Sequence, residues 1–200
     1  MFGIPAASMF ATDRYSFLKK IKFGRKSQTY RLLGTCYESN IEDKKFEEIF
    51  RFDRGENIES SVCNALFIDN PELNKWTIED INLGDLSKNL KIKFAPPALK
   101  RRSDERGIPI EQMIMQAAFK GKLYSQILKS YKDTNYYQLL EMDFVIKVSA
   151  EANKLLKKIE DDKGNIDYYK VDSEWPNVYN EILNEEITLL KRKQMEDEET

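Results

Sequence analysis

Apolar residues within residues 109–160 recur at steps of three and four, in two sets separated by a short polar break. The first set lies in residues 110–131 and the second in residues 136–159. Such spacing aligns each set along one face of a helix. The pattern predicts two helices that form an antiparallel hairpin, with Gly164 and Asn165 ending the second helix.

A last helix is predicted near the carboxyl end of the sequence, where an apolar stripe resumes after a turn-rich segment. Asp172 or Ser173 is a suitable N-cap for it, and Trp175 and Pro176 then fall in its first turn. Acidic residues dominate residues 196–199, so we expect the end of this helix to fray.

The pattern in the first half is shorter and less regular. Residues 14–21 have the apolar spacing of an amphipathic helix, which we expect to be followed by a strand near residues 29–37. Residues 39–42, with the sequence Ser-Asn-Ile-Glu, match a capping box. This motif predicts a second helix, which ends near residues 53–55.

Three further segments precede the hairpin. Residues 62–68 are apolar over a run too short for periodicity to separate a strand from a helix turn. A short helix is expected to end near Gly84, and the alternation in residues 90–94 is that of a strand with one solvated face. Residues 95–97, with the sequence Ala-Pro-Pro, break regular structure and are predicted to be the joint between two halves.

Together these elements predict an α+β protein that is predominantly helical, with a mixed N-terminal part followed by a helical hairpin and a C-terminal helix. We expect an apolar N-terminal arm at residues 1–12 and a mixed α/β part at residues 13–95. A helical part is expected at residues 98–193 and an acidic frayed tail at residues 194–200.

Composition narrows the function classes. The 200 residues are 41% hydrophobic, enough for a sizeable core, and the formal net charge of -2 gives no overall attraction to nucleic acid or membrane. Because there is no histidine and Cys36 and Cys63 stand far apart, a zinc site built from thiolates and imidazoles is excluded. Two thiols without a secretory signal indicate a reducing cytoplasm and no disulfide, although the sequence alone leaves a single bridge open.

The sequence lacks the common catalytic and cofactor-binding patterns. Residues 23–27 resemble a phosphate loop only at their end, because Lys19 stands where the motif needs its first glycine. The densest carboxylate group, residues 160–163, stands beside Gly164, where charged residues are typical of a solvated turn. We therefore expect no enzyme, cofactor or metal site, and a metal-dependent hydrolase is the remaining enzymatic alternative.

Two basic stretches favour a different hypothesis, which is nucleic-acid binding. Residues 14–31 hold seven basic residues and no acid, with aromatic residues between them, and a second cluster lies in residues 100–106. Basic residues among aromatics suit the phosphates and bases of single strands. A solvated amphipathic helix explains the same pattern, and we favour it for residues 14–31. The candidate nucleic-acid-binding residues are Arg14, Lys19, Lys20, Lys22, Arg25, Lys26, Lys100, Arg101 and Arg102.

Residues 122–129 (Lys-Leu-Tyr-Ser-Gln-Ile-Leu-Lys) and residues 136–144 (Tyr-Tyr-Gln-Leu-Leu-Glu-Met-Asp-Phe) resemble helical segments of phage tail and baseplate assembly proteins. In those proteins a Tyr-x-x-Leu-x-Met step leads into a helix. The resemblance covers two short amphipathic segments of the chain. It implies a non-enzymatic virion or assembly role, and it assigns no functional residue.

The function that we predict is a non-enzymatic protein–protein interaction or assembly component, a phage virion or tail assembly protein if the resemblance holds. Its partners are expected to be proteins, in a homo-oligomer or a larger assembly, without a membrane and within the cytoplasm or a virion. A nucleic-acid-binding module that uses residues 14–31 and 100–106 is the alternative. The apolar N-terminal arm either packs onto the body of a monomer, which we favour for that state, or inserts into a partner. In the assembly hypothesis its partner-binding residues are Phe2, Ile4, Met9 and Phe10.

Overall fold

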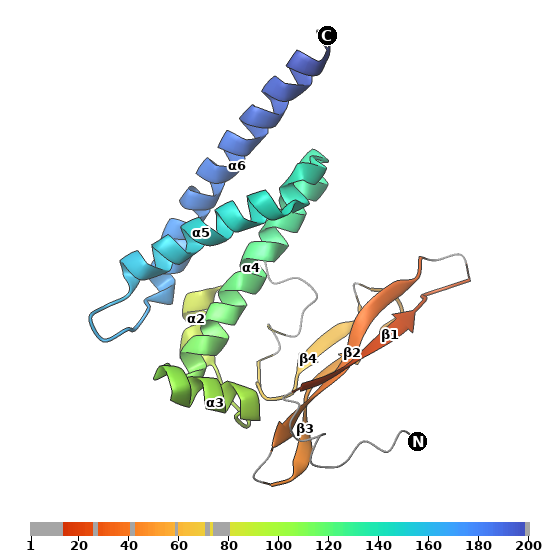
Figure 1. Ribbon diagram of the computed structural model, residues 1–200, viewed down its shortest axis with the longest axis vertical. Helices are drawn as coiled ribbons and strands as arrows, with labels where there is room; N and C mark the ends of the chain where they lie inside the picture. The colour runs from red at the N-terminus through yellow and green to blue at the C-terminus, as the bar shows by residue number, and fades with distance from the viewer. Residues whose placement is uncertain are drawn as a thin grey trace. The chain divides into compact units, whose positions relative to one another are not determined.

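The structure is a computed structural model that describes residues 14–25, 28–40, 43–58, 60–70, 73 and 81–198. The chain divides into two compact units. The first comprises Met1–Ile78 and Asn89–Ala117, and the second comprises Glu79–Lys88 and Ala118–Thr200. The described elements confirm the predicted fold class, an α+β protein with a mixed first part, a helical hairpin and a C-terminal helix (Figure 1).

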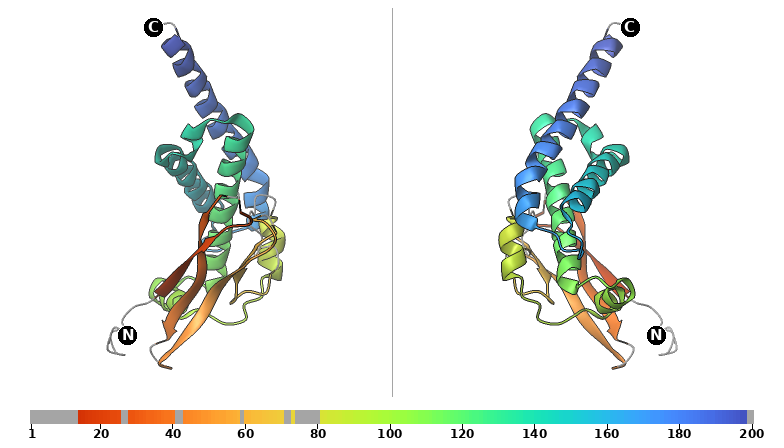
Figure 2. Two further views of the ribbon diagram at one scale, coloured as in Figure 1. Left: turned by 90° about the vertical axis from the view of Figure 1, so that its right-hand side faces the viewer. Right: turned by 90° about the vertical axis from the view of Figure 1, so that its left-hand side faces the viewer.

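The first unit contains a four-stranded antiparallel sheet in the order β1-β2-β3-β4. Aromatic and β-branched residues are frequent in it, and they favour a pleated, half-buried surface. A β-bulge interrupts the β1–β2 pairing after Phe17 and another interrupts the β2–β3 pairing after Cys36, which increases the twist visible in Figure 2. The strands are Arg14–Ile21 (β1), Tyr30–Asn40 (β2), Lys45–Asp53 (β3) and Val62–Ala65 (β4).

Two of the predicted helices are wrong, the one at residues 14–21 and the one that follows the capping box at residues 39–42. Residues 14–21 form β1, and Ser39 lies in β2 instead of capping a helix, with β3 next in the chain. The helical spacing of Phe46, Ile49 and Phe50 misleads here, because residues 50–53 (Phe-Arg-Phe-Asp) alternate as in a strand and pairing with β2 decides the outcome. The strand expected near residues 29–37 is confirmed as β2.

The shorter segments also differ in part from expectation. The ambiguous run of residues 62–68 contains strand β4. In place of the strand predicted at residues 90–94, Ile92 makes an isolated bridge with Ile68. A helix passes through Gly84 instead of ending near it, because α2 spans Leu83–Asn89.

A buried carboxylate joins helix α3 (Pro97–Arg106) to the sheet. Glu38 on β2 is 1% exposed, and its Oε2 accepts a hydrogen bond of 2.9 Å from the backbone N–H of Ala98. Its Oε1 accepts hydrogen bonds from Arg14 Nε at 3.2 Å and Arg14 Nη2 at 2.6 Å. Proline at the first helical position has no N–H to satisfy, and a carboxylate is favourable at a helix N-terminus. One carboxylate therefore holds β1, β2 and α3 together.

The second unit is helical, and the two helices of the predicted hairpin are present in the structure as α4 and α5. In α5 the buried residues recur every three or four positions from Phe144 to Ile159, as the sequence pattern requires. Ion pairs of Lys147 with Glu185 and Lys158 with Glu174 show that α5 and α6 run antiparallel. Beyond α2, the elements are α4 (Ile110–Thr134, which begins in the first unit), η2 (Tyr137–Leu140), α5 (Met142–Ile159) and α6 (Tyr168–Glu198).

Helix α6 begins earlier than the sequence suggests. It starts at Tyr168, so Asp172 and Ser173 lie inside the helix rather than at its N-cap, and Pro176 is an internal proline. Because proline has no N–H, it cannot donate the helical hydrogen bond to the carbonyl of Asp172. The helix nevertheless continues, and its C-terminal part extends beyond the start of α5 (Figures 1 and 2).

The core of the helical unit centres on Trp175, which is 1% exposed. Its ring contacts Phe119 edge to face, with 5.3 Å between ring centroids, and its Nε1 donates a hydrogen bond of 2.7 Å to Gln126 Oε1. Beside it, Tyr179 shares a buried hydrogen bond of 2.8 Å with Ser130. Burial raises the pKa of Tyr179, and the hydrogen bond with Ser130 acts in the opposite direction. The indole and the phenol therefore both bury their rings while keeping a polar partner.

A second buried ion pair links three segments of the helical unit. Lys122 Nζ on α4 lies 2.7 Å from Asp172 Oδ1 on α6, and it also donates to the carbonyl of Ile81 at 2.8 Å. Asp172 Oδ2 accepts a hydrogen bond of 3.0 Å from the backbone N–H of Gly84. Lys122 and Asp172 are mostly buried, at 11% and 16% side-chain exposure. Their contacts hold α2 against α4 and α6.

Tyr168→Phe is expected to raise the free energy of unfolding by about 1 kcal/mol, measured by urea titration. Within the described part of the chain the buried hydroxyl of Tyr168 has no hydrogen-bond partner, and burial raises its pKa above the usual range. The variant lacks this hydroxyl, so folding no longer has to desolvate it, while the ring keeps its packing. Tyr179→Phe is the matched control, because it loses a bonded hydroxyl and should lower stability. Equal losses for both variants would contradict this assignment.

Candidate interaction site

Four aromatic rings form a hollow on one face of the sheet. Tyr15 and Phe17 come from β1, Tyr37 from β2 and Phe46 from β3, and they line a space of about 250 Å³. Tyr15 meets Phe46 edge to face with 5.2 Å between ring centroids, and Phe17 meets Tyr37 in the same way at 5.9 Å. This geometry is preferred for aromatic pairs. The rings therefore support one another and leave a concave apolar surface, which we call the aromatic face.

The register of the strands explains why these rings meet. Tyr15 lies opposite Tyr37 and Phe17 lies opposite Thr35, so both β1 rings project to the same side of the sheet. Phe46 lies opposite Ser39, two residues beyond Tyr37 on β2, and thus on that side too. The aromatic face is consequently a product of strand pairing and not of any local sequence motif.

The aromatic face includes an exposed ring of an edge strand. Strand β1 lies at one edge of the described sheet, where it pairs with β2. Its Phe17, one of the four rings, is 54% exposed, which is high for a large apolar residue. Its neighbour Leu18 is 76% exposed but projects to the opposite side of the sheet. Apolar exposure such as that of Phe17 beside an apolar hollow marks interaction surfaces on soluble proteins.

Charges of both signs surround the aromatic face. Glu48 lies opposite Tyr37, and Arg51 lies opposite Thr35, so both belong to the same side as the rings. Arg51 Nε donates to Glu48 Oε1 at 3.0 Å, and Nη2 makes a second contact with Glu48 Oε2. The hydrogen bonds from Arg51 lower the pKa of Glu48, with a smaller contribution from the charge of Lys19. The rim therefore offers both acceptors and donors to a partner.

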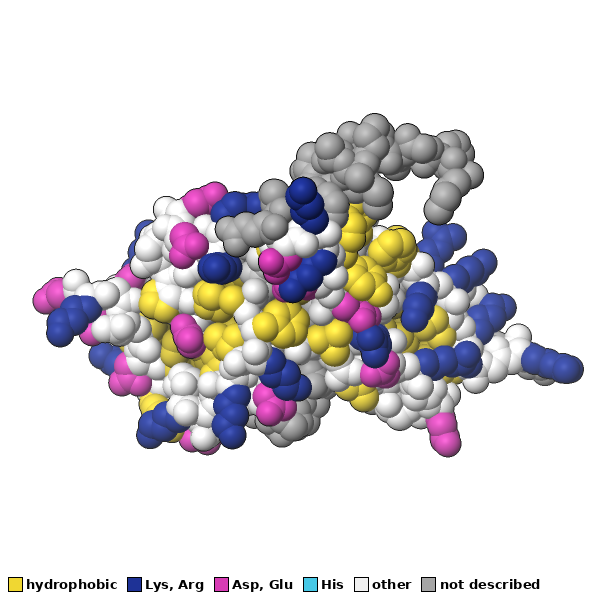
Figure 3. All heavy atoms as spheres, turned by 90° about the horizontal axis from the view of Figure 1, so that it is seen from below, with side chains coloured by type: hydrophobic (Ala, Val, Ile, Leu, Met, Phe, Trp, Pro, Cys, Tyr) yellow, Lys and Arg dark blue, Asp and Glu magenta, His cyan; other side chains and the backbone are white. Residues whose placement is uncertain are grey.

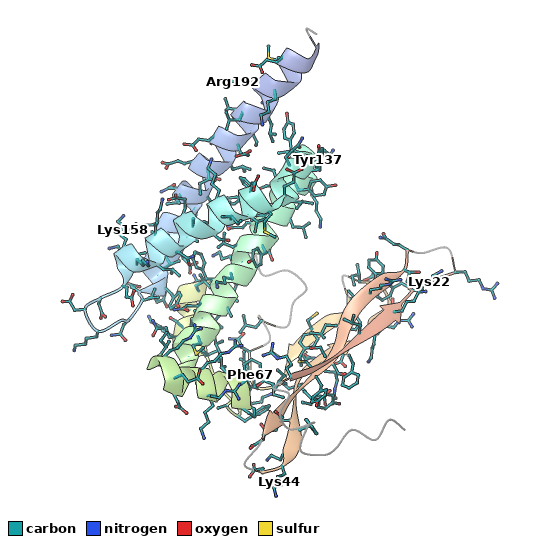
Figure 4. The ribbon with its side chains drawn as sticks, viewed as in Figure 1. Lys22, Lys44, Phe67, Tyr137, Lys158 and Arg192 are labelled. Carbon is teal, nitrogen blue, oxygen red and sulfur yellow. The ribbon has the colours of Figure 1, made fainter. Side chains whose placement is uncertain are left out.

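Apart from Arg14, which binds Glu38, the described basic residues of the first stretch lie at the other end of β2 from α3. Lys20 pairs with Arg31 near the start of β2, whereas α3, with Lys100, is held at Glu38 near the other end of this strand. The 11 residues of β2 span about 30 Å. Figure 4 labels Lys22 and Lys44 at the two ends of the sheet. Because Arg14 is the one described member of the first stretch at the α3 end, the two basic stretches do not form one patch.

The other candidate residues have varied environments. Arg14 is bound by Glu38, and Arg101 lies 3.9 Å from Glu105. Lys100 and Arg102, also on α3, are exposed. Lys26 and the predicted partner-binding residues lie outside the described residues; the latter are Phe2, Ile4, Met9 and Phe10.

Sequence reasoning did not single out Tyr37 and Phe46 as members of a surface. The available signal was the alternation of apolar and polar residues at positions 50–53 (Phe-Arg-Phe-Asp), which is that of a strand with two different faces. Reading residues 45–53 as a strand would have placed Phe46 on one side of a sheet. Its neighbours on that side still required knowledge of the strand register.

A second exposed apolar group lies where η2 leads into α5. Met142 is 70% exposed, and three residues near it in sequence are also exposed. Figure 4 labels Tyr137, the first of them, near the end of α4. No hollow of aromatic rings accompanies this group in the described residues. Its members are Tyr137, Leu140, Met142 and Ile146.

The chemistry of the described residues supplies no metal centre. Among them there is no group of three or more His, Cys, Asp or Glu residues arranged to hold an ion. In the acidic turn at residues 160–163, Asp161 accepts backbone hydrogen bonds from Lys163 at 2.9 Å and Asn165 at 2.8 Å. The hydrogen bonds from Asn165 lower the pKa of Asp161. This carboxylate therefore stabilises the turn.

Comparisons of the chain with protein-family models, with curated proteins and with solved structures found no match. None of the helices that the structure describes has the length and apolar content needed to cross a bilayer. Function is therefore inferred from the surfaces described above.

Proposed function

We propose that this chain is a non-enzymatic protein–protein interaction and assembly component that associates with further copies of itself. The observation that carries the proposal is the aromatic face, where the exposed Phe17 is one of four rings that line a hollow. Aromatic anchors seated in pockets supply most of the affinity in protein interfaces. Burying a side chain such as Phe17 contributes about 1.5–3 kcal/mol.

The charges around the aromatic face favour a second copy of this chain as the partner. In a two-fold contact the same surface meets itself, so an interface needs charges of both signs. Glu48 supplies a negative charge, and Arg51 and Lys19 supply positive charges on the same rim. Each copy can therefore place an acid opposite a base of the other copy, which fixes register and partner choice.

The resemblance of residues 122–129 and 136–144 to phage tail and baseplate assembly proteins extends the proposal to a virion. Such assemblies are built from repeated contacts between protein subunits, and their components need binding surfaces rather than reacting groups. The aromatic face is a surface of this kind. The predicted arm residues, including Phe2 and Phe10, would add a second contact to the same assembly.

Phe17→Asp is expected to weaken self-association by at least about tenfold, because a charge buried in an apolar interface costs more than the 1.4 kcal/mol that a tenfold change represents. The measurement is the molar mass by light scattering after size-exclusion chromatography, over a wide range of protein concentration. The wild-type chain should show a mass above that of the 23.5 kDa monomer.

Met142→Asp is the matched control, since it places the same charge on another exposed apolar residue away from the aromatic face. It is expected to leave the mass unchanged. A chain that lacks residues 1–11 should remain folded but associate more weakly. A wild-type chain that is monomeric throughout, or dissociation by Met142→Asp but not by Phe17→Asp, would refute the proposal.

A further inference from the structure

Positive charge gathers at the closed end of the β1–β2 hairpin. Lys19 and Lys20 lie at the end of β1, Lys22 and Arg25 follow in the turn, and Arg31 lies near the start of β2. None of these five residues has an ion-pair partner within the described part of the chain. Figure 3 shows dark blue side chains at the right-hand end of the molecule, where Figure 1 draws this hairpin.

The strand register places two of these positive charges directly opposite each other, which increases their repulsion. Lys20 lies directly opposite Arg31 in the antiparallel pair. Like charges in directly opposed positions destabilise a sheet. The pair therefore does not serve the stability of the hairpin, and an external anion would relieve the repulsion.

A third strand brings another cation and a hollow to the same place. Arg54, just after β3, donates a hydrogen bond of 2.8 Å from Nη2 to the carbonyl of Lys22. A hollow of about 560 Å³ lies beside it. One acid, Asp53, faces this space, and it already accepts a hydrogen bond from Asn64. The hollow is lined by Lys19, Lys20, Ile21, Phe52, Asp53 and Arg54.

Aromatic rings stand among these cations. The guanidinium of Arg54 lies over the ring of Phe23, 5.5 Å from its centroid, and Phe23 meets Tyr30 edge to face at 5.7 Å. Rings and guanidinium planes next to a positive groove are the features with which proteins bind single strands without reading their sequence. Duplex recognition instead requires an element that enters a groove.

We propose that the hairpin end binds single-stranded nucleic acid. Lys20, Lys22, Arg25 and Arg31 contact phosphates, and bases lie against Phe23 and the Arg54 guanidinium. The basic residues of α3 take no part, because they lie at the other end of β2. The four phosphate-binding residues are not part of the aromatic face, whose rim shares Lys19 with the hollow, and the proposal does not depend on the proposed assembly function.

The test is fluorescence anisotropy with a fluorescein-labelled oligothymidylate of about 20 nucleotides, long enough for a single-strand site. Four phosphate contacts predict a slope of about -3 in a plot of log K against log salt, so binding should be about 50-fold weaker at 200 mM salt than at 50 mM. The triple variant Lys20→Glu, Lys22→Glu, Arg25→Glu is expected to bind at least about 100-fold more weakly than the wild type.

The matched control is the triple variant Lys100→Glu, Arg101→Glu, Arg102→Glu, which carries the same change of charge and should bind as the wild type does. Circular dichroism checks that each variant is folded. If the glutamates disturb the hairpin, the double variant Lys20→Gln, Lys22→Gln replaces the triple variant in the test. Phe23→Leu should weaken binding about tenfold, as expected for one lost stacking contact.

Three outcomes would overturn the proposal. The first is no anisotropy change at low salt, and the second is an equal loss in the α3 control. The third is an affinity for polyglutamate equal to that for the oligothymidylate. An equal affinity for a duplex of the same length, combined with no effect of Phe23→Leu, has the same meaning. That third result would assign the hairpin to acidic proteins or to polyanions in general.

Discussion

Lys122→Met is expected to lower the free energy of unfolding of the helical unit by about 3–5 kcal/mol, because it leaves a mostly buried carboxylate without its counter-charge. Asp172 would keep only the hydrogen bond from the backbone N–H of Gly84. The carbonyl of Ile81 would also lose its donor. Methionine fills a similar volume, so the loss would report the charge and the hydrogen bonds rather than a cavity.

The measurement is a urea titration followed by the helical circular dichroism signal. Lys120→Met is the control: it lies on the same helix and is exposed, so its effect should stay within about 0.5 kcal/mol. Adding Asp172→Asn to Lys122→Met removes the stranded charge and should recover part of the loss. If Lys120→Met and Lys122→Met had equal effects, the proposed role of the Lys122–Asp172 pair would be wrong.

The helical part of this fold could be predicted from the sequence because its determinants are local. In α5, a helix of 18 residues, the buried residues from Phe144 to Ile159 repeat at helical spacing, long enough for the period to be unambiguous. The start of α6 was predicted less well. Asp172 has the chemistry of an N-cap, but its side chain is used by Lys122 and Gly84, which are distant in sequence.

The sheet could not be predicted from local spacing alone. In residues 14–21 a few apolar positions fit a helix as well as a strand, and strand pairing with β2 determines which forms. The Ser39 motif shows the same competition, since a capping box stabilises a helix only where no strand partner competes for the backbone. Tertiary pairing thus overrides local preference in short segments.

The candidate surfaces were visible in part. Tyr15 and Phe17 stand in the basic stretch that the sequence singles out, but their ring partners Tyr37 and Phe46 are joined to them only through the strand register. Likewise, the sequence left open whether its two basic stretches meet. The structure instead pairs the first stretch with Arg54, which follows another strand.

Glu38→Ala is expected to lower the free energy of unfolding of the sheet unit by about 3 kcal/mol, since three hydrogen bonds to a buried carboxylate are lost. The backbone N–H of Ala98 would be left buried without its acceptor, which adds a desolvation penalty. The guanidinium of Arg14 is half exposed and can turn to water, which limits the total. Glu38→Gln should cost less, because one oxygen remains to accept a bond.

The loss should appear in the thermal unfolding midpoint and as faster amide exchange at Ala98 and along β2, because Glu38 links this strand to α3. Glu47→Ala is the matched control, as this residue lies opposite Glu38 on β3 and its ion pair with Lys45 is accessible to solvent. Its effect should remain below about 1 kcal/mol. A Glu38→Ala variant as stable as Glu47→Ala would show that this carboxylate does not join the helix to the sheet.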